Sequence, residues 1–136
     1  MSATSEYILL FRGQDWDTNL TPDETRQMLA RLTTWMESVQ RTAKVKTGQP
    51  LERTGNIVSG KNGRSVTDGP FTESKEAIGG YLLIEATSID DAIAIAQSYP
   101  PLEYGISIEI RPTVLECPIN KRQRERDQHF TVTATA

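Results

Sequence analysis

Apolar residues in this chain fall into short blocks with the spacing of strands or helices, separated by turn residues. Residues 6–11 are apolar almost throughout, which is typical of a buried strand. Residues 78–85 form a second such block, and its centre is apolar on both faces. In the segment 105–111 isoleucine occupies every second position, which predicts a further strand with one apolar face.

Two segments carry the start signals of helices. Thr21-Pro22-Asp23-Glu24 combines a capping threonine, a proline suited to the first helical position and a glutamate that completes a capping box. The apolar stripe of this helix is expected to pack on the core and consists of Met28, Leu32, Trp35, Met36 and Val39. Ser88 begins a second helix, Pro100-Pro101 ends it, and one side carries Ile89, Ala92, Ile93 and Ala96.

The middle of the chain predicts a short strand at 44–46 and then a hairpin with strands at 56–59 and 64–67. Its turn is Lys61-Asn62-Gly63, because Asn-Gly readily adopts positive φ angles. The expected order is therefore strand, helix, strands, strand, helix, strand. That order predicts an α+β fold with a ferredoxin-like subunit, whose helices cover one face of an antiparallel sheet. The other face is expected to pair with a second copy, giving a homodimer built as a dimeric α+β barrel.

Length and charge exclude several classes of protein. The 136 residues predict one domain at 1–115, followed by a polar tail at 116–136. For the tail three interpretations are open: disorder, an arm that orders on a partner, or a strand at 130–133 added to a neighbour's sheet.

A net charge of −3 argues against a nucleic-acid binder. The single cysteine, Cys117, and the absence of a leader-like or membrane-spanning run favour the cytoplasm and no membrane contact.

The run 66–76, which contains Asp68-Gly69-Pro70-Phe71, together with Ile78-Gly79-Gly80-Tyr81, closely resembles the signature of the DGPF proteins, a branch of the YCII-related family. The resemblance covers about residues 6–114 and implies the same dimeric α+β barrel. Relatives are often associated with extracytoplasmic-function sigma factors, which implies a regulatory context. Better understood relatives include lyases and dehydrochlorinases of small ring compounds, which pair a histidine on the first helix with an aspartate. This helix has no histidine, Arg31 takes the matching position, and the sole histidine, His129, lies in the tail.

Candidate chemistry centres on Asp68. Its carboxylate is either a proton acceptor and ligand anchor in a cleft or a turn-capping group. Glu76 is the second candidate catalytic carboxylate. The candidate binding residues, some of which equally suit turns, bulges or solvated ion pairs, are Gly69, Pro70, Phe71, Glu73, Gly79, Gly80, Arg31 and Arg111. No metal site and no cofactor are expected, because the domain lacks histidine and has no CxxC pair.

These residues favour a dimeric accessory protein that binds a small molecule or serves in regulation. The alternative is an enzyme of the lyase or isomerase type acting on a small ring compound. In that alternative Asp68 or Glu76 is the base, and Arg31 or Arg111 stabilises the developing negative charge. Trp16, a large ring among polar loop residues, is expected to cover the cleft or to pack on the second copy.

Overall fold

The computed structural model describes residues 4–13, 15–69 and 77–135, with 129–135 given by the backbone alone. Four antiparallel strands form the main sheet in the order β2-β5-β1-β6. Their bounds are β1 (Ser5–Arg12), β2 (Lys44–Pro50), β5 (Ile78–Ala86) and β6 (Ser107–Pro112). From β1 to β6 the elements follow the predicted order of strand, helix, strands, strand, helix and strand, and the arrangement is an α+β fold of ferredoxin-like type.

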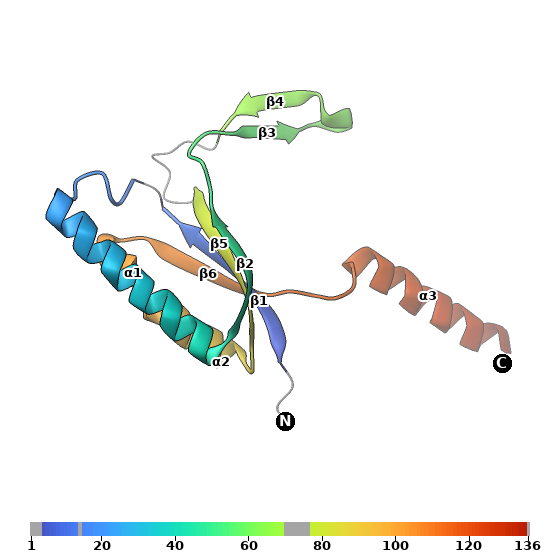
Figure 1. Ribbon diagram of the computed structural model, residues 1–136. Helices are drawn as coiled ribbons and strands as arrows, with labels where there is room; N and C mark the ends of the chain where they lie inside the picture. Colours follow the sequence, from blue (N-terminus) through green and yellow to red (C-terminus); the bar gives the residue numbers. More distant parts are fainter. Residues whose placement is uncertain (1–3, 14, 70–76, 136) are drawn as a thin grey trace.

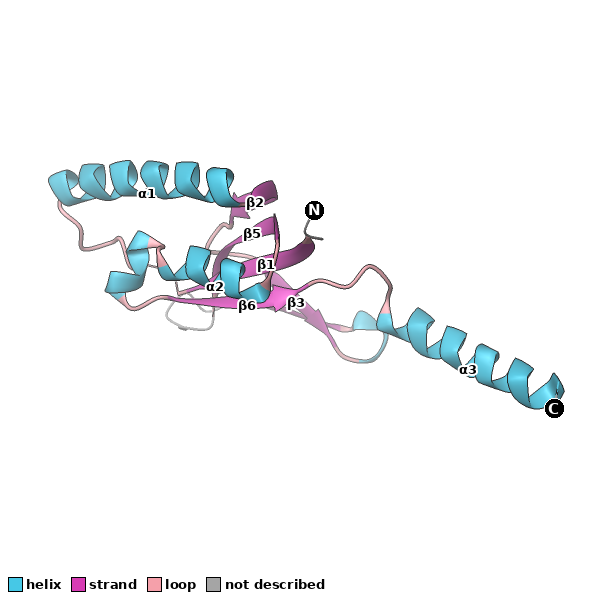
Figure 2. Ribbon diagram, turned by 90° about the horizontal axis from the view of Figure 1, so that it is seen from below, coloured by secondary structure: helices cyan, strands magenta, loops and turns pink. Residues whose placement is uncertain are grey.

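The helices begin where the capping residues predict. Helix α1 (Pro22–Thr42) starts after Thr21, whose side chain accepts a hydrogen bond from the Glu24 amide (3.1 Å) while the Glu24 carboxylate accepts one from the Thr21 amide (2.9 Å). Helix α2 (Ile89–Gln97) starts after Ser88, whose hydroxyl accepts from the Asp91 amide at 3.1 Å. Both helices lie on the same side of the main sheet (Figures 1 and 2).

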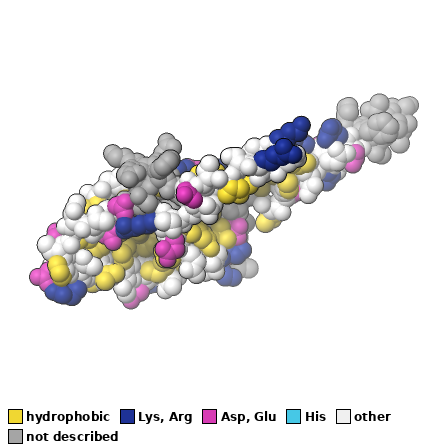
Figure 3. All heavy atoms as spheres, turned by 90° about the horizontal axis from the view of Figure 1, so that it is seen from above, with side chains coloured by type: hydrophobic (Ala, Val, Ile, Leu, Met, Phe, Trp, Pro, Cys, Tyr) yellow, Lys and Arg dark blue, Asp and Glu magenta, His cyan; other side chains and the backbone are white. Residues whose placement is uncertain are grey.

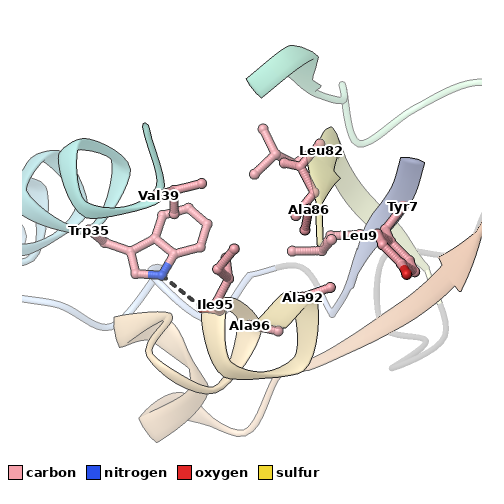
Figure 4. Packing of buried hydrophobic residues seen from close by; sticks show 10 residues of the cluster. Tyr7, Leu9, Trp35, Val39, Leu82, Ala86, Ala92, Ile95 and Ala96 are labelled. Carbon is pink, nitrogen blue, oxygen red and sulfur yellow. Dashed lines mark hydrogen bonds between the residues drawn. The ribbon is translucent and has the colours of Figure 1, made fainter. Parts of the chain in front are cut away.

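The core lies between this sheet face and the helices (Figure 4). Leu9 and Ile84 are completely buried at its centre, and Trp35 of α1 reaches across to α2. On α2 the predicted apolar side is only partly confirmed: Ala92 and Ala96 are buried together with Ile95, whereas Ile89 and Ile93 are exposed. Isoleucine and alanine occur on several sides of this short helix, so the sequence pattern does not identify one narrow apolar stripe that faces the core.

Strand β2 is longer than the predicted 44–46. Its pairing with β5 continues to Pro50 after a register shift between Val45 and Thr47. The edge position explains why Pro50 is tolerated. On the outer side of an edge strand there is no neighbouring strand, so a proline whose nitrogen faces that side removes no hydrogen bond between strands.

The predicted hairpin forms a sheet of its own. Within the described residues, strands β3 (Asn56–Ser59) and β4 (Ser65–Asp68) pair only with each other, and the short helix η1 (Lys61–Gly63) makes the turn. Asn62 and Gly63 both have positive φ, at 63° and 65°, as the Asn-Gly pair requires. Figure 1 shows this hairpin standing off one end of the main sheet.

The sheet face opposite the helices has an apolar centre and charged borders. The strand register places Ile8, Leu10 and Leu83 on it, all half-buried. At one border Lys46 donates to Glu6 at 2.6 Å, and this hydrogen bond lowers the pKa of the Glu6 carboxyl and raises that of the Lys46 amine. We call this surface the open face.

The tail is helical from Pro118 to Thr135, which corrects the expectation of disorder or of a strand at 130–133. Arginine, lysine, glutamine and glutamate dominate its first half and are good helix formers, and Gln123 donates to Asp127 one turn later at 3.1 Å. This helix, α3, projects away from the sheet, and its described part carries a group of Lys and Arg side chains (Figures 1 and 3). None of the described helices has both the length and the apolar character that a membrane crossing needs.

Candidate functional site

A cavity of about 490 Å³ lies between α1 and the edge of the sheet formed by β2 and β5. Residues of α1, β2 and β5 make most of its wall, and residues at the end of β1, in the loop after it, just after α2 and just before β6 complete it. Its described lining consists of Phe11, Gly13, Trp16, Leu32, Trp35, Met36, Gln40, Val45, Gly48, Gln49, Pro50, Gly79, Gly80, Tyr81, Leu82, Tyr99 and Ile106. Volume and lining are those of a pocket for a small organic molecule.

Three aromatic rings meet in this wall. The ring centroids of Phe11 and Tyr99 are 4.8 Å apart, as are those of Trp35 and Tyr99, and Phe11 meets Trp35 edge-on at 6.5 Å. The indole nitrogen of Trp35 donates to the Ile95 carbonyl at 3.1 Å and to the Ser98 hydroxyl at 3.0 Å. Because its polar edge is bonded toward α2, Trp35 offers the cavity mainly carbon surface. Burial raises the pKa of the Tyr99 hydroxyl, so this group is neutral at physiological pH.

Gly79 and Gly80 form the floor of the cavity at the start of β5. Phe11 pairs with Gly80 and Arg12 with Ile78, so Gly79 is the extra residue of a β-bulge. A Cβ atom on Gly80 would lie 3.1 Å from the Gln49 carbonyl oxygen of β2. The bulge and the close backbone approach that the sequence offered as reasons for this glycine pair are therefore both present.

The described wall is nearly free of charge. No Asp, Glu, Lys, Arg or His belongs to it within residues 4–13, 15–69 and 77–135. The side-chain hydrogen-bonding groups on the helix side of the wall belong to Gln40, Tyr99 and Trp16, whereas the strand register turns the side chains of Gln49 and Tyr81 toward the open face. This arrangement suits binding of a neutral molecule, and it supplies no general acid or base from the described part of the chain.

Trp16 takes part in this wall from the loop between β1 and α1. Its ring stacks on that of Tyr104, with centroids 5.7 Å apart and planes 23° apart. Tyr104 ends the short helix η2 (Pro100–Tyr104) that follows α2. The prediction that Trp16 covers a cleft thus has a geometric basis, although the cleft lies beside α1 and not at the Asp68 turn.

Asp68 lies outside this cavity, at the end of β4. It is exposed, pairs with Asn56 in the hairpin register, and its carboxylate accepts a hydrogen bond from the Asn56 side-chain amide at 3.3 Å. Gly69 is buried, and its amide donates to the Gly55 carbonyl at 3.0 Å, which extends the hairpin by one rung. Pro70, Phe71, Glu73 and Glu76 fall in 70–76, outside the described residues.

The two candidate arginines lie on opposite sides of the sheet. Arg31 points from α1 toward η2, where it forms a two-pronged ion pair with Glu103 at 2.8 and 3.3 Å, beside an open hollow separate from the cavity. Arg111 lies on the open face, exposed and 3.8 Å from the Glu109 carboxylate. The structure therefore does not bring Asp68, Arg31 and Arg111 together in one site. It does bring Gly79 and Gly80 to the cavity.

The sequence does not single out the residues that define the cavity. Phe11, Trp35 and Tyr99 each fit an ordinary apolar strand or helix pattern, which predicts a place in the core and no more. One signal was available: Gly48 and the Gly79-Gly80 pair leave positions without side chains in two segments that the structure shows to be paired strands. The described residues contain no cluster of His, Cys, Asp and Glu arranged to hold a metal ion.

Comparison with known families matches residues 7–114 to the model of the YCII-related domain. A search of curated proteins found no match. The matched range begins in β1 and ends just after β6, so it contains all of the main sheet except the first two residues of β1, both packed helices and the inserted hairpin. The helix α3 lies beyond it. With most of its length matched in this way, the chain belongs to the YCII-related family.

Proposed function

We propose that this protein binds a small, uncharged and largely apolar molecule in the cavity between α1 and the sheet. The observation that carries the proposal is the described lining of this 490 Å³ space, which is aromatic and aliphatic and lacks Asp, Glu, Lys, Arg and His. Pockets of this size bury most of the surface of a small organic ligand. A charged ligand is disfavoured because the described part of the cavity wall offers no opposite charge to offset its loss of water.

Binding, rather than catalysis, is the activity that the described wall supports best. The alternative of a lyase or isomerase needs a carboxylate at the ligand; of its two candidate bases, Asp68 lies on the separate hairpin and Glu76 falls outside the described residues. A binding protein of this kind suits a regulatory accessory role. The motif Asp68-Gly69-Pro70-Phe71 supports placing it in the DGPF branch, and through that branch supports a link to a sigma factor.

The binding unit in this proposal is a homodimer formed through the open face, with two sheets packed as a dimeric α+β barrel. Ile8, Leu10 and Leu83 supply an apolar centre that none of the helices in the described part of the chain covers. At the border opposite Lys46, Arg12 donates to Glu109 at 2.5 Å. An apolar centre with a charged border is the usual composition of an interface between two copies.

The binding proposal is tested with N-phenyl-1-naphthylamine, a neutral aromatic probe whose emission rises in apolar surroundings. We expect saturable binding to the unmodified protein. The anionic probe 8-anilinonaphthalene-1-sulfonate has the same ring system with an added sulfonate, and we expect it to bind at least about tenfold more weakly, because its charge must lose water. Titration with direct excitation of each probe measures both constants.

Leu32→Trp is expected to weaken binding of the neutral probe by about tenfold or more, because the larger side chain at this wall position takes up space that the probe needs inside the cavity. Leu29→Trp is the matched control: it lies one turn earlier on α1, is 58% exposed and does not line the cavity. Equal affinities for the two variants would place the probe elsewhere, and no saturable binding to the unmodified protein would overturn the proposal.

Leu83→Glu is expected to convert the dimer to monomers, because it places a carboxylate in the centre of the proposed interface. Light scattering coupled to gel filtration should report twice the mass of one chain for the unmodified protein and one chain mass for this variant. Leu29→Glu, a charge added to an exposed position on α1, should leave the dimer intact. A monomeric unmodified protein at micromolar concentration would contradict the dimer.

A further inference from the structure

Arg53 links two loops at one end of the cavity by ion pairs: the loop that follows β1 and the connection that follows β2. It lies in the connection between β2 and β3, three residues after Pro50 of the cavity wall. Its guanidinium forms an ion pair with Asp15, through Nη1, and another with Asp17, through Nη2 at 3.3 Å. Both aspartates flank Trp16, which also belongs to the wall.

The topology explains why one side chain can span this end. Strands β1 and β2 both run antiparallel to β5, so their C-terminal ends lie at the same end of the sheet (Figure 1). The loop after β1 carries Trp16 and the connection after β2 carries Arg53. Among the described residues, Arg53 is the side chain that links this loop to the β2 side of the cavity by ion pairs.

The Trp16 loop is shaped as a compact turn that Arg53 holds at two points. Asp15 has a positive φ of 65°, and its carbonyl accepts hydrogen bonds from both the amide and the hydroxyl of Thr18. The Oδ1 atom of Asp15 is shielded from solvent and faces Arg53. Asp17 and Arg53 are about half exposed, so their pair is open to salt.

We propose that Arg53 is a latch that keeps the Trp16 loop closed over this end of the cavity, so that ligand entry and exit both require the two ion pairs to open. The inference rests on the proposed binding function and adds how access to that site is controlled. Ion pairs of this exposure are weak enough to break on the timescale of loop motion. Removing the latch shifts the closed-to-open equilibrium of the loop and replaces no residue of the cavity wall, because Arg53 is not one of its described lining residues.

A latch has a kinetic signature that a wall residue lacks. If opening limits access, weakening the latch raises the association and dissociation rates together and leaves their ratio nearly constant. A residue that only contacts the ligand changes the dissociation rate alone. For the uncharged naphthylamine probe, salt acts through the protein and not through the encounter, so salt dependence of the rates reports on the ion pairs.

The test is stopped-flow mixing of the full chain with N-phenyl-1-naphthylamine. For Arg53→Gln we expect both rates to rise by about three- to fivefold, with the affinity changed by less than about twofold. Raising NaCl from about 0.05 M to about 0.5 M should accelerate both rates of the unmodified protein and leave those of Arg53→Gln nearly constant. Arg26→Gln is the matched control, because Arg26 pairs only with Asp23 of its own helix in the described residues.

Rates of Arg53→Gln equal to those of Arg26→Gln, or a change confined to dissociation, would overturn the latch while leaving the binding site in place. Failure of the unmodified protein to bind the probe at all would instead remove the proposed function. Asp17→Asn breaks one of the two ion pairs at an exposed position and should raise both rates by a smaller factor. It keeps the test decisive if Arg53→Gln does not fold.

Discussion

Replacing Trp35 by alanine is expected to lower the free energy of unfolding by about 4 kcal/mol. Trp35 is 5% exposed, contacts the rings of Phe11 and Tyr99, and its indole nitrogen bonds the last turn of α2 at Ile95 and Ser98. The space that the indole vacates opens into the existing cavity, so neighbouring side chains have little to collapse onto. Urea unfolding followed by circular dichroism, at one protein concentration, measures the loss.

Trp16→Ala is the matched control for this change, because the chain has two tryptophans and both contact the cavity. Trp16 is half-buried in a loop and stacks on one exposed ring, so its removal should lower the free energy of unfolding by about 1 kcal/mol. Equal losses for the two variants would show that Trp35 does not join α1 to α2 as described.

Gly48→Ala is expected to lower the free energy of unfolding by about 2 kcal/mol. A Cβ atom on Gly48 would lie 2.9 Å from the carbonyl oxygen of Tyr81 and 2.7 Å from a methyl group of Leu82, so β2 must move away from β5. The sign is informative, since alanine in place of a strand glycine otherwise stabilises by about 0.5–1 kcal/mol.

The neighbouring variant Thr47→Ala checks this interpretation. Thr47 is exposed on the same strand, and its replacement should change the free energy of unfolding by no more than about 0.5 kcal/mol. Thermal unfolding of the two variants side by side measures the difference. An increase in stability for Gly48→Ala would mean that the two strands are less closely spaced than the structure has them.

Elements with local signals could be predicted from the sequence. Thr21 and Ser88 cap their helices through hydrogen bonds between residues three apart, and Asn62-Gly63 turns the hairpin through its own φ angles. None of these depends on a distant part of the chain. The tail was misread because composition alone does not distinguish an exposed helix from a disordered segment.

The cavity could not be predicted in the same way, because it depends on contacts between distant residues. Phe11 and Tyr99 are 88 positions apart, and their juxtaposition follows from the packing of two helices on the sheet. Arg31 was assigned to the site by its place on α1, but the pairing with Glu103 directs it to the outer side of that helix. Helical spacing gives relative directions, and the tertiary packing decides which direction is inward.

The position of the two tryptophans gives the protein a built-in optical reporter. Trp16 and Trp35 both lie against the cavity, and the chain has no other indole. Ultraviolet emission excited at the red edge of protein absorption therefore arises wholly from that neighbourhood, with no contribution from the projecting helix or the hairpin. A library of unlabelled metabolites can be screened directly by the quenching or spectral displacement that each compound produces.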